Sequence, residues 1–167
     1  RDRVNPEKID TTPIRRPFWI KVGDPNGESY QHMKEMMRSK ELHTVCEEAN
    51  CPNMGECWGS GTATFLILGD ICTRKCGFCD IKHGKPMPID WEEPERVAKA
   101  VKAMGLTHAV ITSVDRDDDN LGGAKIFAMV IERIRALHPG CSVEVLIPDF
   151  KGDREALKIV MDARPEI

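Results

Sequence analysis

From residue 62 onward the chain alternates short apolar runs with longer segments of helical periodicity. The apolar runs are short and rich in β-branched residues, as buried strands are. They are TATFLILG (62–69), THAVITSV (107–114) and SVEVLIPD (142–149). Beyond each run, apolar residues recur every three or four positions, which predicts a helix. The predicted helices span 93–105, 122–140 and 153–163.

This alternation constrains the topology of the sheet. Two strands joined through a helical crossover run parallel, and such crossovers are right-handed. We therefore expect an α/β fold with three β/α units, arranged as an open doubly wound sheet or as a β/α barrel. In either arrangement the loops after the carboxyl ends of the strands carry the chemistry.

The first third of the chain is less regular. Residues 1–29 hold several prolines and glycines, which predicts an extended arm, and three methionines at helical spacing predict a short helix over 30–42. A cysteine-rich stretch follows this helix. We therefore divide the chain into an N-terminal part, 1–61, with the arm, the short helix and a cysteine-rich loop, and a body of β/α units, 62–167.

Composition excludes few functions. The 167 residues, 41% hydrophobic and 31% charged, are ordinary for one globular domain, and the net charge of -3 gives no electrostatic case for binding nucleic acid. No apolar run approaches the roughly 20 residues of a membrane span, and the polar start does not resemble a signal peptide. Seven cysteines without an export signal predict a reducing compartment: the cytoplasm or, in a eukaryote, the mitochondrial matrix or a plastid.

Three cysteines, the downstream trio, stand directly after the first predicted strand. Cys72, Cys76 and Cys79 are spaced C-x3-C-x2-C in GDICTRKCGFCDIKHGKP, residues 69–86. A disulfide needs two cysteines and a closed zinc site four ligands, whereas three thiolates can hold three irons of a 4Fe-4S cluster and leave the fourth open. An open iron can bind S-adenosylmethionine, and an electron from the cluster can cleave it to a 5'-deoxyadenosyl radical. A zinc site at Cys76 and Cys79, with Cys72 incidental, is the alternative.

A second set, the upstream trio, precedes the first predicted strand. Cys46, Cys51 and Cys57 are spaced C-x4-C-x5-C in VCEEANCPNMGECWGSG. This trio alone is less specific, because three cysteines in a loop with proline and glycine can also bind zinc together with a distant fourth ligand. The two trios together are more specific than either one.

The order and surroundings of the trios resemble a known family. C-x3-C-x2-C with aromatic Phe78 before its last cysteine is similar to the signature of the radical S-adenosylmethionine superfamily. With CEEANCPNMGECW upstream and ITSVDRDDDNLGGA at 111–124, the chain resembles the lipoyl synthases from about Pro13 to its last residue. The resemblance implies a partial β/α barrel of the radical S-adenosylmethionine type, with about three β/α units present here.

Lipoyl synthases insert two sulfur atoms at C6 and C8 of a protein-bound octanoyl chain to form the lipoyl cofactor. The resemblance implies two 4Fe-4S clusters and S-adenosylmethionine as cofactors. It also implies an octanoylated lipoyl domain or glycine-cleavage H protein as partner, and an electron donor such as flavodoxin or ferredoxin. The downstream trio would hold the cluster that cleaves S-adenosylmethionine, and the upstream trio an auxiliary cluster that is consumed as the sulfur source.

The family pattern also carries residues near the downstream trio, but no catalytic side chain beyond the cluster ligands. The residues expected to contact S-adenosylmethionine are Phe78, Asp80, Ile81, Ser113, Asp115, Arg116 and Asp117. For the loop SVDRDDDNLGG the alternative is a solvated acidic turn that caps the next helix. Among the histidines, His83 is the one to test near the cofactor, and Gly122 and Gly123 predict a tight turn.

Two other functions fit the cysteines. One is a different two-cluster radical S-adenosylmethionine enzyme that inserts sulfur, against which the upstream spacing argues; the other is a zinc-binding interaction module without activity. The family pattern has six β/α units and a C-terminal Arg-Ser-Ser-Tyr motif whose serine ligates the auxiliary cluster, whereas this chain ends at MDARPEI, where a fourth strand should begin. We therefore expect a C-terminally truncated lipoyl synthase, and little or no turnover from these 167 residues alone.

Overall fold

The computed structural model describes residues 28–39, 42–48, 51 and 53–167. Its elements are α1 (Glu28–Ser39), β1 (His43–Thr44), α2 (Val45–Glu48), α3 (Met54–Gly59), β2 (Thr62–Ile67), α4 (Glu93–Ala103), β3 (His108–Ser113), α5 (Ala124–Leu137), β4 (Ser142–Leu146), the 3-10 turn η2 (Phe150–Gly152) and α6 (Arg154–Asp162). The predicted arm lies outside the described residues, except for Glu28 and Ser29, which begin α1.

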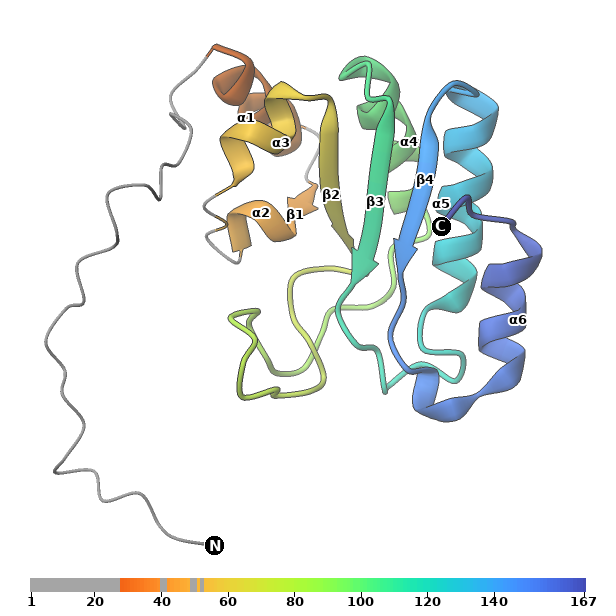
Figure 1. The fold of residues 1–167 in the computed structure, drawn as a ribbon. Coiled ribbons are helices and arrows are strands. Elements are labelled where there is room, and N and C mark those ends of the chain that lie inside the picture. Colours follow the sequence, from red (N-terminus) through yellow and green to blue (C-terminus); the bar gives the residue numbers. More distant parts are fainter. Residues whose placement is uncertain (1–27, 40–41, 49–50, 52) are drawn as a thin grey trace, which may run out of the picture.

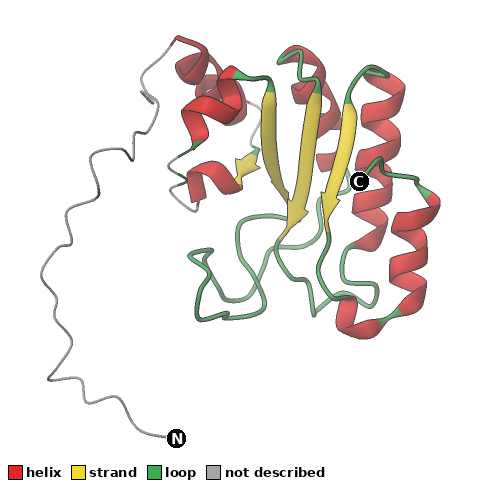
Figure 2. Cartoon of the chain, in the orientation of Figure 1, coloured by secondary structure: helices red, strands yellow, loops and turns green. Residues whose placement is uncertain are grey.

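The sheet has the order β1-β2-β3-β4, and β2, β3 and β4 run parallel (Figures 1 and 2). The first residues of the parallel strands lie in register, with Thr62 opposite His108 and His108 opposite Ser142. The three predicted strands and the helix after each are therefore confirmed, with ends that differ by one to three residues. The fold is α/β, as expected, and its three β/α units are consistent with part of a barrel.

Alternation along the strands decides which face of the sheet is buried. Phe65 and Ile67 of β2 and Ile111 of β3 point into the core, where Val101 of α4 and Phe127 of α5 pack against them. Fully burying side chains of this size stabilises a fold by roughly 1.5–3 kcal/mol each. In Figure 1, α4 and α5 lie behind the parallel strands, and no described helix lies in front of them.

The N-terminal part adds to this sheet. The two-residue strand β1 pairs antiparallel with β2, His43 opposite Leu66, and so covers part of an edge that would otherwise be open. Met37 of α1 and Trp58 of α3 are buried in the same apolar core as β2. The division at residues 61 and 62 stays a prediction, since β1 before it is hydrogen-bonded to β2 after it.

The opposite edge, along β4, is occupied by the last residues of the chain. The Glu166 amide donates to the Val143 carbonyl at 2.9 Å, and the Val145 amide donates to the Ile167 carbonyl at 2.9 Å. Arg135 of α5 donates to the carbonyls of Ala163 and Arg164, which fixes the turn before this pairing. A fourth strand was expected to begin here, and this pairing agrees with that expectation.

Candidate cluster-binding site

The loops that follow the three parallel strands gather at one end of the sheet (Figure 2). The longest, here called the cluster loop, covers residues 68–92 and carries the downstream trio. All three of these cysteines line a single cavity of about 100 Å³. The other residues that line it are Arg74, Lys75, Ile81, His83, Ser113, Val114 and Asp115. The expectation that chemistry gathers at the carboxyl ends of the strands therefore agrees with the structure.

Cys72 is the most firmly held member of the downstream trio. Its amide donates to the Lys82 carbonyl at 2.8 Å and its carbonyl accepts from the Gly84 amide at 2.9 Å, so the loop folds back and pairs Cys72 with His83 as an isolated parallel bridge. Its Sγ accepts from the amides of Arg74 at 3.4 Å and Asp115 at 3.3 Å. Amide donors of this kind stabilise negative charge on a thiolate or a cluster-bound sulfur.

Cys76 and Cys79 are exposed on the outer part of the cluster loop, in a turn closed by the Cys79 amide and the Cys76 carbonyl at 3.2 Å. Among the described residues, no three His, Cys, Asp or Glu side chains converge tightly enough to ligate one ion. A 4Fe-4S cluster places its thiolates on separate irons, so its ligands surround a volume rather than meet at a point. Three free thiols around one cavity fit that donor set.

Three of the residues predicted to contact S-adenosylmethionine line the cavity. Ile81 supplies an apolar wall, and Ser113 and Asp115 stand at the carboxyl end of β3. Within the described part of the chain, the buried Ser113 Oγ has no hydrogen-bond partner. Burial raises the pKa of Asp115, against the lowering effect of Arg74. A buried hydroxyl without a partner is costly unless a ligand or water completes it, which favours a polar ligand here.

The other four predicted contacts lie elsewhere. Phe78 is 95% exposed and Asp80 is exposed, both outside the cavity. The Arg116 side chain is only 3% exposed and donates to Asp118 at 2.8 and 2.9 Å and to the Leu68 carbonyl at 3.3 Å. Asp117 is paired with Arg74. Arg116 and Asp117 thus bind other parts of the protein, and all four remain predictions as cofactor contacts.

The base of the cluster loop is held by two buried charged residues. Leu68 has φ +69°, a left-handed conformation that costs a non-glycine residue about 1 kcal/mol. Its amide donates to Glu93 Oε2 at 2.8 Å, and its carbonyl accepts from Arg116. Burial raises the pKa of Glu93. At Gly123, φ +82°, any Cβ would overlap the Leu68 side chain, so the second glycine of the predicted tight turn is required there.

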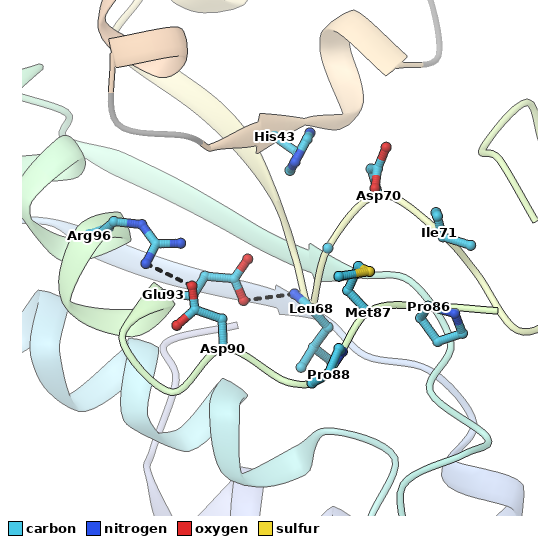
Figure 3. A pocket seen from close by; sticks show the side chains of 11 residues that line it. His43, Leu68, Asp70, Ile71, Pro86, Met87, Pro88, Asp90, Glu93 and Arg96 are labelled. Carbon is cyan, nitrogen blue, oxygen red and sulfur yellow. Dashed lines mark hydrogen bonds and ion pairs between the residues drawn. The ribbon is translucent and has the colours of Figure 1, made fainter. Parts of the chain in front are cut away.

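Glu93 also borders a second cavity, of about 270 Å³, on the other side of the loop base (Figure 3). Its wall includes an ion pair between Asp90 and Arg96 at 2.8 Å. The lining residues come from β1, the cluster loop and α4, and they are His43, Leu68, Gly69, Asp70, Ile71, Pro86, Met87, Pro88, Asp90, Glu93 and Arg96. No sequence pattern predicts this cavity, because its wall is assembled from segments that are far apart in the chain.

The upstream trio is built differently. Cys46 is 7% exposed in α2, and Cys51 and Cys57 are half-buried, Cys57 in α3. The Cys51 amide donates to the Cys46 carbonyl at 2.9 Å. Burial raises the pKa of Cys57, and the neighbouring Cys46 and Cys51 thiols raise it further. Two members of the trio thus stand on short helices that the sequence did not predict, and Cys51 lies between these helices.

One residue near the site was not predicted. The side chain of Arg74, two residues after Cys72, pairs with Asp117 and with Asp149 in the loop after β4. Arg74 and Asp149 are 75 positions apart in the chain, so no local sequence motif links them. None of the helices in the described part of the chain is long and apolar enough to cross a membrane.

Comparison with known proteins identifies the family to which the chain is similar. Residues 66–167 match the radical SAM superfamily, and residues 2–51 match the N-terminal domain of lipoyl synthase of the radical SAM family. A lipoyl synthase of Rubrobacter xylanophilus is 62% identical over 90% of this chain and 47% of its own length. One of Koribacter versatilis is 57% identical over 93% and 51%, and one of Chloroflexus aggregans 58% identical over 98% and 54%.

The chain spans about half the length of the curated relatives it matches. The superfamily match covers more than half of the chain, including the downstream trio, the end of β2 and the whole of β3 and β4. It implies an iron–sulfur cluster and S-adenosylmethionine as cofactors. The resemblance drawn from the cysteine motifs is therefore confirmed: this chain belongs to the radical SAM superfamily, and its relatives there are lipoyl synthases.

Proposed function

We propose that this chain provides the S-adenosylmethionine-cleaving half of a lipoyl synthase, the enzyme that inserts two sulfur atoms at C6 and C8 of a protein-bound octanoyl chain. The observation that carries the proposal is one cavity at the carboxyl ends of the strands, lined by three free thiols and by Ser113, whose buried Oγ has no hydrogen-bond partner among the described residues. When bound there, a 4Fe-4S cluster and S-adenosylmethionine supply the radical that removes hydrogen from unactivated carbons, for which no side-chain base suffices.

The residues of the cavity have separate tasks in this proposal. Cys72 is fixed by its backbone pairing and by two amides that donate to its sulfur, so it sets the position of the cluster. Cys76 and Cys79 lie on the exposed part of the loop and close around the cluster from outside. Ser113 and Asp115 would hold S-adenosylmethionine, with the Ser113 hydroxyl donating a hydrogen bond to a polar group and Asp115 accepting one from an amino group. Ile81 excludes water from one side.

The upstream trio holds the second cluster in this proposal, the one consumed as the source of sulfur. Its three thiols stand on α2, on α3 and between them, and none of them lines the downstream cavity. The match to the N-terminal domain of lipoyl synthase includes Cys46 and Cys51. Separate protein segments allow one cluster to be dismantled while the other remains as the electron carrier.

The partners follow from this chemistry. We propose that the substrate is an octanoyl chain on a lipoyl domain or a glycine-cleavage H protein, and that an electron donor such as flavodoxin or ferredoxin reduces the downstream cluster. All seven cysteines are free thiols, which suits a reducing compartment, and the cytoplasm remains the predicted location.

Anaerobic reconstitution of the chain with iron and sulfide tests the proposal. We expect roughly eight irons per chain with matching acid-labile sulfide. With a chemical reductant and S-adenosylmethionine, we expect methionine and 5'-deoxyadenosine, and the triple variant Cys72→Ser, Cys76→Ser, Cys79→Ser should lose this cleavage and about half of the iron. Bound zinc without sulfide would contradict the proposal and support a zinc-binding module instead.

An octanoylated carrier peptide tests the sulfur-insertion step. Cleavage of S-adenosylmethionine without lipoyl product agrees with the expectation that these 167 residues alone have little turnover. Lipoyl product would contradict that expectation and would place both steps in this chain. A different sulfur-inserted product would favour another two-cluster enzyme of the superfamily.

A further inference from the structure

The side chain of Arg74 lies where the loops after all three parallel strands meet. Its Nε and Nη2 donate to the two carboxylate oxygens of Asp117, both at 2.8 Å. Its Nη1 and Nη2 donate to the two oxygens of Asp149, also both at 2.8 Å. Arg74 belongs to the loop after β2, Asp117 to the loop after β3 and Asp149 to the loop after β4. One guanidinium therefore joins three loops with two bidentate ion pairs.

This contact needs the shape of an arginine. A guanidinium carries five N–H donors in a plane and can present one edge to each of two carboxylates, whereas a lysine ammonium has its three donors on a single nitrogen. Asp115 Oδ1 is a third acidic neighbour, 3.6 Å from Nη1. Three carboxylates around one cation would repel each other if the cation were removed.

The charged groups around Arg74 shift one another's pKa values. The ion pairs with Asp117 and Asp149 raise the pKa of Arg74. The same guanidinium lowers the pKa of Asp117, and it lowers the pKa of Asp149 to about 2. Lys151 adds a second cation, its Nζ donating to the Asp117 carbonyl at 3.2 Å. The carboxylates of Asp117 and Asp149 are therefore ionised at neutral pH, whereas burial raises the pKa of Asp115.

Next to the ion pairs, hydrogen bonds of Thr73 join the cluster loop to the loop after β3, directly beside Cys72. The Thr73 amide and hydroxyl both donate to the Asp115 carbonyl, at 3.1 and 2.9 Å, and the Asp117 amide donates to the Thr73 hydroxyl at 3.1 Å. Arg74 follows Thr73 directly and lines the same cavity as Cys72 and Ser113. A shift of Arg74 away from Asp117 therefore moves Cys72 relative to the carboxyl end of β3.

We propose that Arg74 and Asp149 are positioning residues that hold the cluster loop against the loops after β3 and β4, and so fix the distance between the cluster and the S-adenosylmethionine contacts. This inference rests on the proposed function. Asp149 is not among the residues predicted to contact S-adenosylmethionine, and it joins the cluster loop through its ion pair with Arg74.

Two conservative variants, Arg74→Lys and Asp149→Asn, test this positioning role. Each keeps side-chain size while removing one or both bidentate pairs. Matched controls are Arg133→Lys, whose partner Glu95 lies on α4, and Asp162→Asn, which pairs with Lys158 within α6. Neither control pair lines the cavity that holds the downstream trio. Iron content and the thermal midpoint of the apo chain are measured first, to confirm that every variant folds and binds iron.

The first readout is amide hydrogen exchange in the apo chain. The amides of Thr73 and Asp117 should exchange about tenfold faster in Arg74→Lys, and less so in Asp149→Asn, with no change in the controls. The second readout is the change in the electron paramagnetic resonance spectrum of the reduced cluster during titration with S-adenosylmethionine. The half-saturating concentration should rise about tenfold in Arg74→Lys and about threefold in Asp149→Asn.

The outcomes separate this inference from the proposed function. If the unaltered chain shows no spectral change with S-adenosylmethionine, the proposed function fails and the positioning role fails with it. If the unaltered chain responds but both variants titrate like it, the positioning role is overturned and the proposed function stands. Faster exchange without weaker binding would also overturn it, leaving Arg74 a purely structural residue.

Discussion

The upstream trio is packed among apolar side chains, whereas the downstream trio lies on a loop held by hydrogen bonds and ion pairs. Cys46 belongs to the same buried core as Trp58, and Cys51 and Cys57 pack against that core. Around the downstream trio only Cys72 is firmly held, while Cys76 and Cys79 are exposed. One site depends on burial and the other on directional polar contacts.

The difference has consequences for how each site can change. Apolar packing tolerates changes of salt and pH but fails when volume is lost, because interiors are close-packed. Polar contacts at a partly exposed loop are weaker and more sensitive to charge, but they allow the outer part of the loop to move. A site that must admit a cofactor on every turnover suits the second arrangement, and a site that surrounds a preformed cluster suits the first.

The largest effect is expected from removing the upstream thiols together. The triple variant Cys46→Ser, Cys51→Ser, Cys57→Ser should lose about half of the roughly eight irons while still cleaving S-adenosylmethionine. Iron analysis and 5'-deoxyadenosine assay check both parts. Loss of cleavage in this variant would show that the two sites depend on each other, contrary to the comparison.

Removing the buried indole of the upstream region should have the next largest effect. Trp58 is 3% exposed, and Trp58→Ala should lower the free energy of unfolding by about 3–5 kcal/mol, since it leaves a cavity in the core. Chemical denaturation followed by circular dichroism measures it. Trp91, 55% exposed, provides the control, because Trp91→Ala should cost about 1 kcal/mol or less. Equal losses would argue that burial does not hold the upstream site.

The base of the cluster loop can be disturbed through one methyl group. Gly123→Ala places a Cβ against the Leu68 side chain at φ +82° and should cost about 1–3 kcal/mol. It should also weaken binding of S-adenosylmethionine, because Leu68 begins the loop. Gly140→Ala is the matched control, since a Cβ there meets nothing within 4 Å. Calorimetric unfolding of both variants is the measurement, and indistinguishable midpoints would contradict this account of Leu68.

The smallest effect is expected from the pH dependence of Glu93. Burial raises its pKa above the ordinary value of 4.5, so the folded chain holds this proton more tightly than the unfolded chain. The contribution to stability is therefore complete below pH 4.5 and is lost as the pH rises through the folded pKa. Glu93→Gln lacks this titration but keeps an acceptor for the Leu68 amide.

Thermal midpoints of the unaltered chain and Glu93→Gln, measured across this range, check the sign. The unaltered chain should lose a few degrees relative to the variant as the pH rises. A difference between the two proteins that stays constant with pH would mean that burial does not perturb Glu93. The opposite trend would mean that Arg96 and Arg116 stabilise its charge more than burial opposes it.

Periodicity predicted the regular half of this molecule well. The strand and helix predicted at 107–114 and 122–140 are β3 and α5, shortened at their ends, because each is long enough for its apolar repeat to be visible. The two-residue β1 and the short α2 and α3 escaped prediction, since they form only against β2 and carry no repeat of their own.

The candidate site divides in the same way. The spacing of the cysteines located the downstream trio. The family resemblance pointed to Ser113 and Asp115 in the loop after the next strand, and both residues line the same cavity as the trio. The contacts that hold the loop, Arg74 with Asp149 and Glu93 with Leu68, join segments far apart in the chain. Such pairs depend on the packing of the whole fold, and no local pattern in the sequence marks them.

The two edges of the sheet are paired in different ways. On one side β1 runs antiparallel to β2, which ends the parallel order there. On the other side the backbone at 166 and 167 already bonds to β4 in line with the strands before it. The two edges of the described sheet are therefore not equivalent: the edge beside the cysteine-bearing helices ends in an antiparallel pair, and the edge at β4 is covered by backbone from residues 166 and 167.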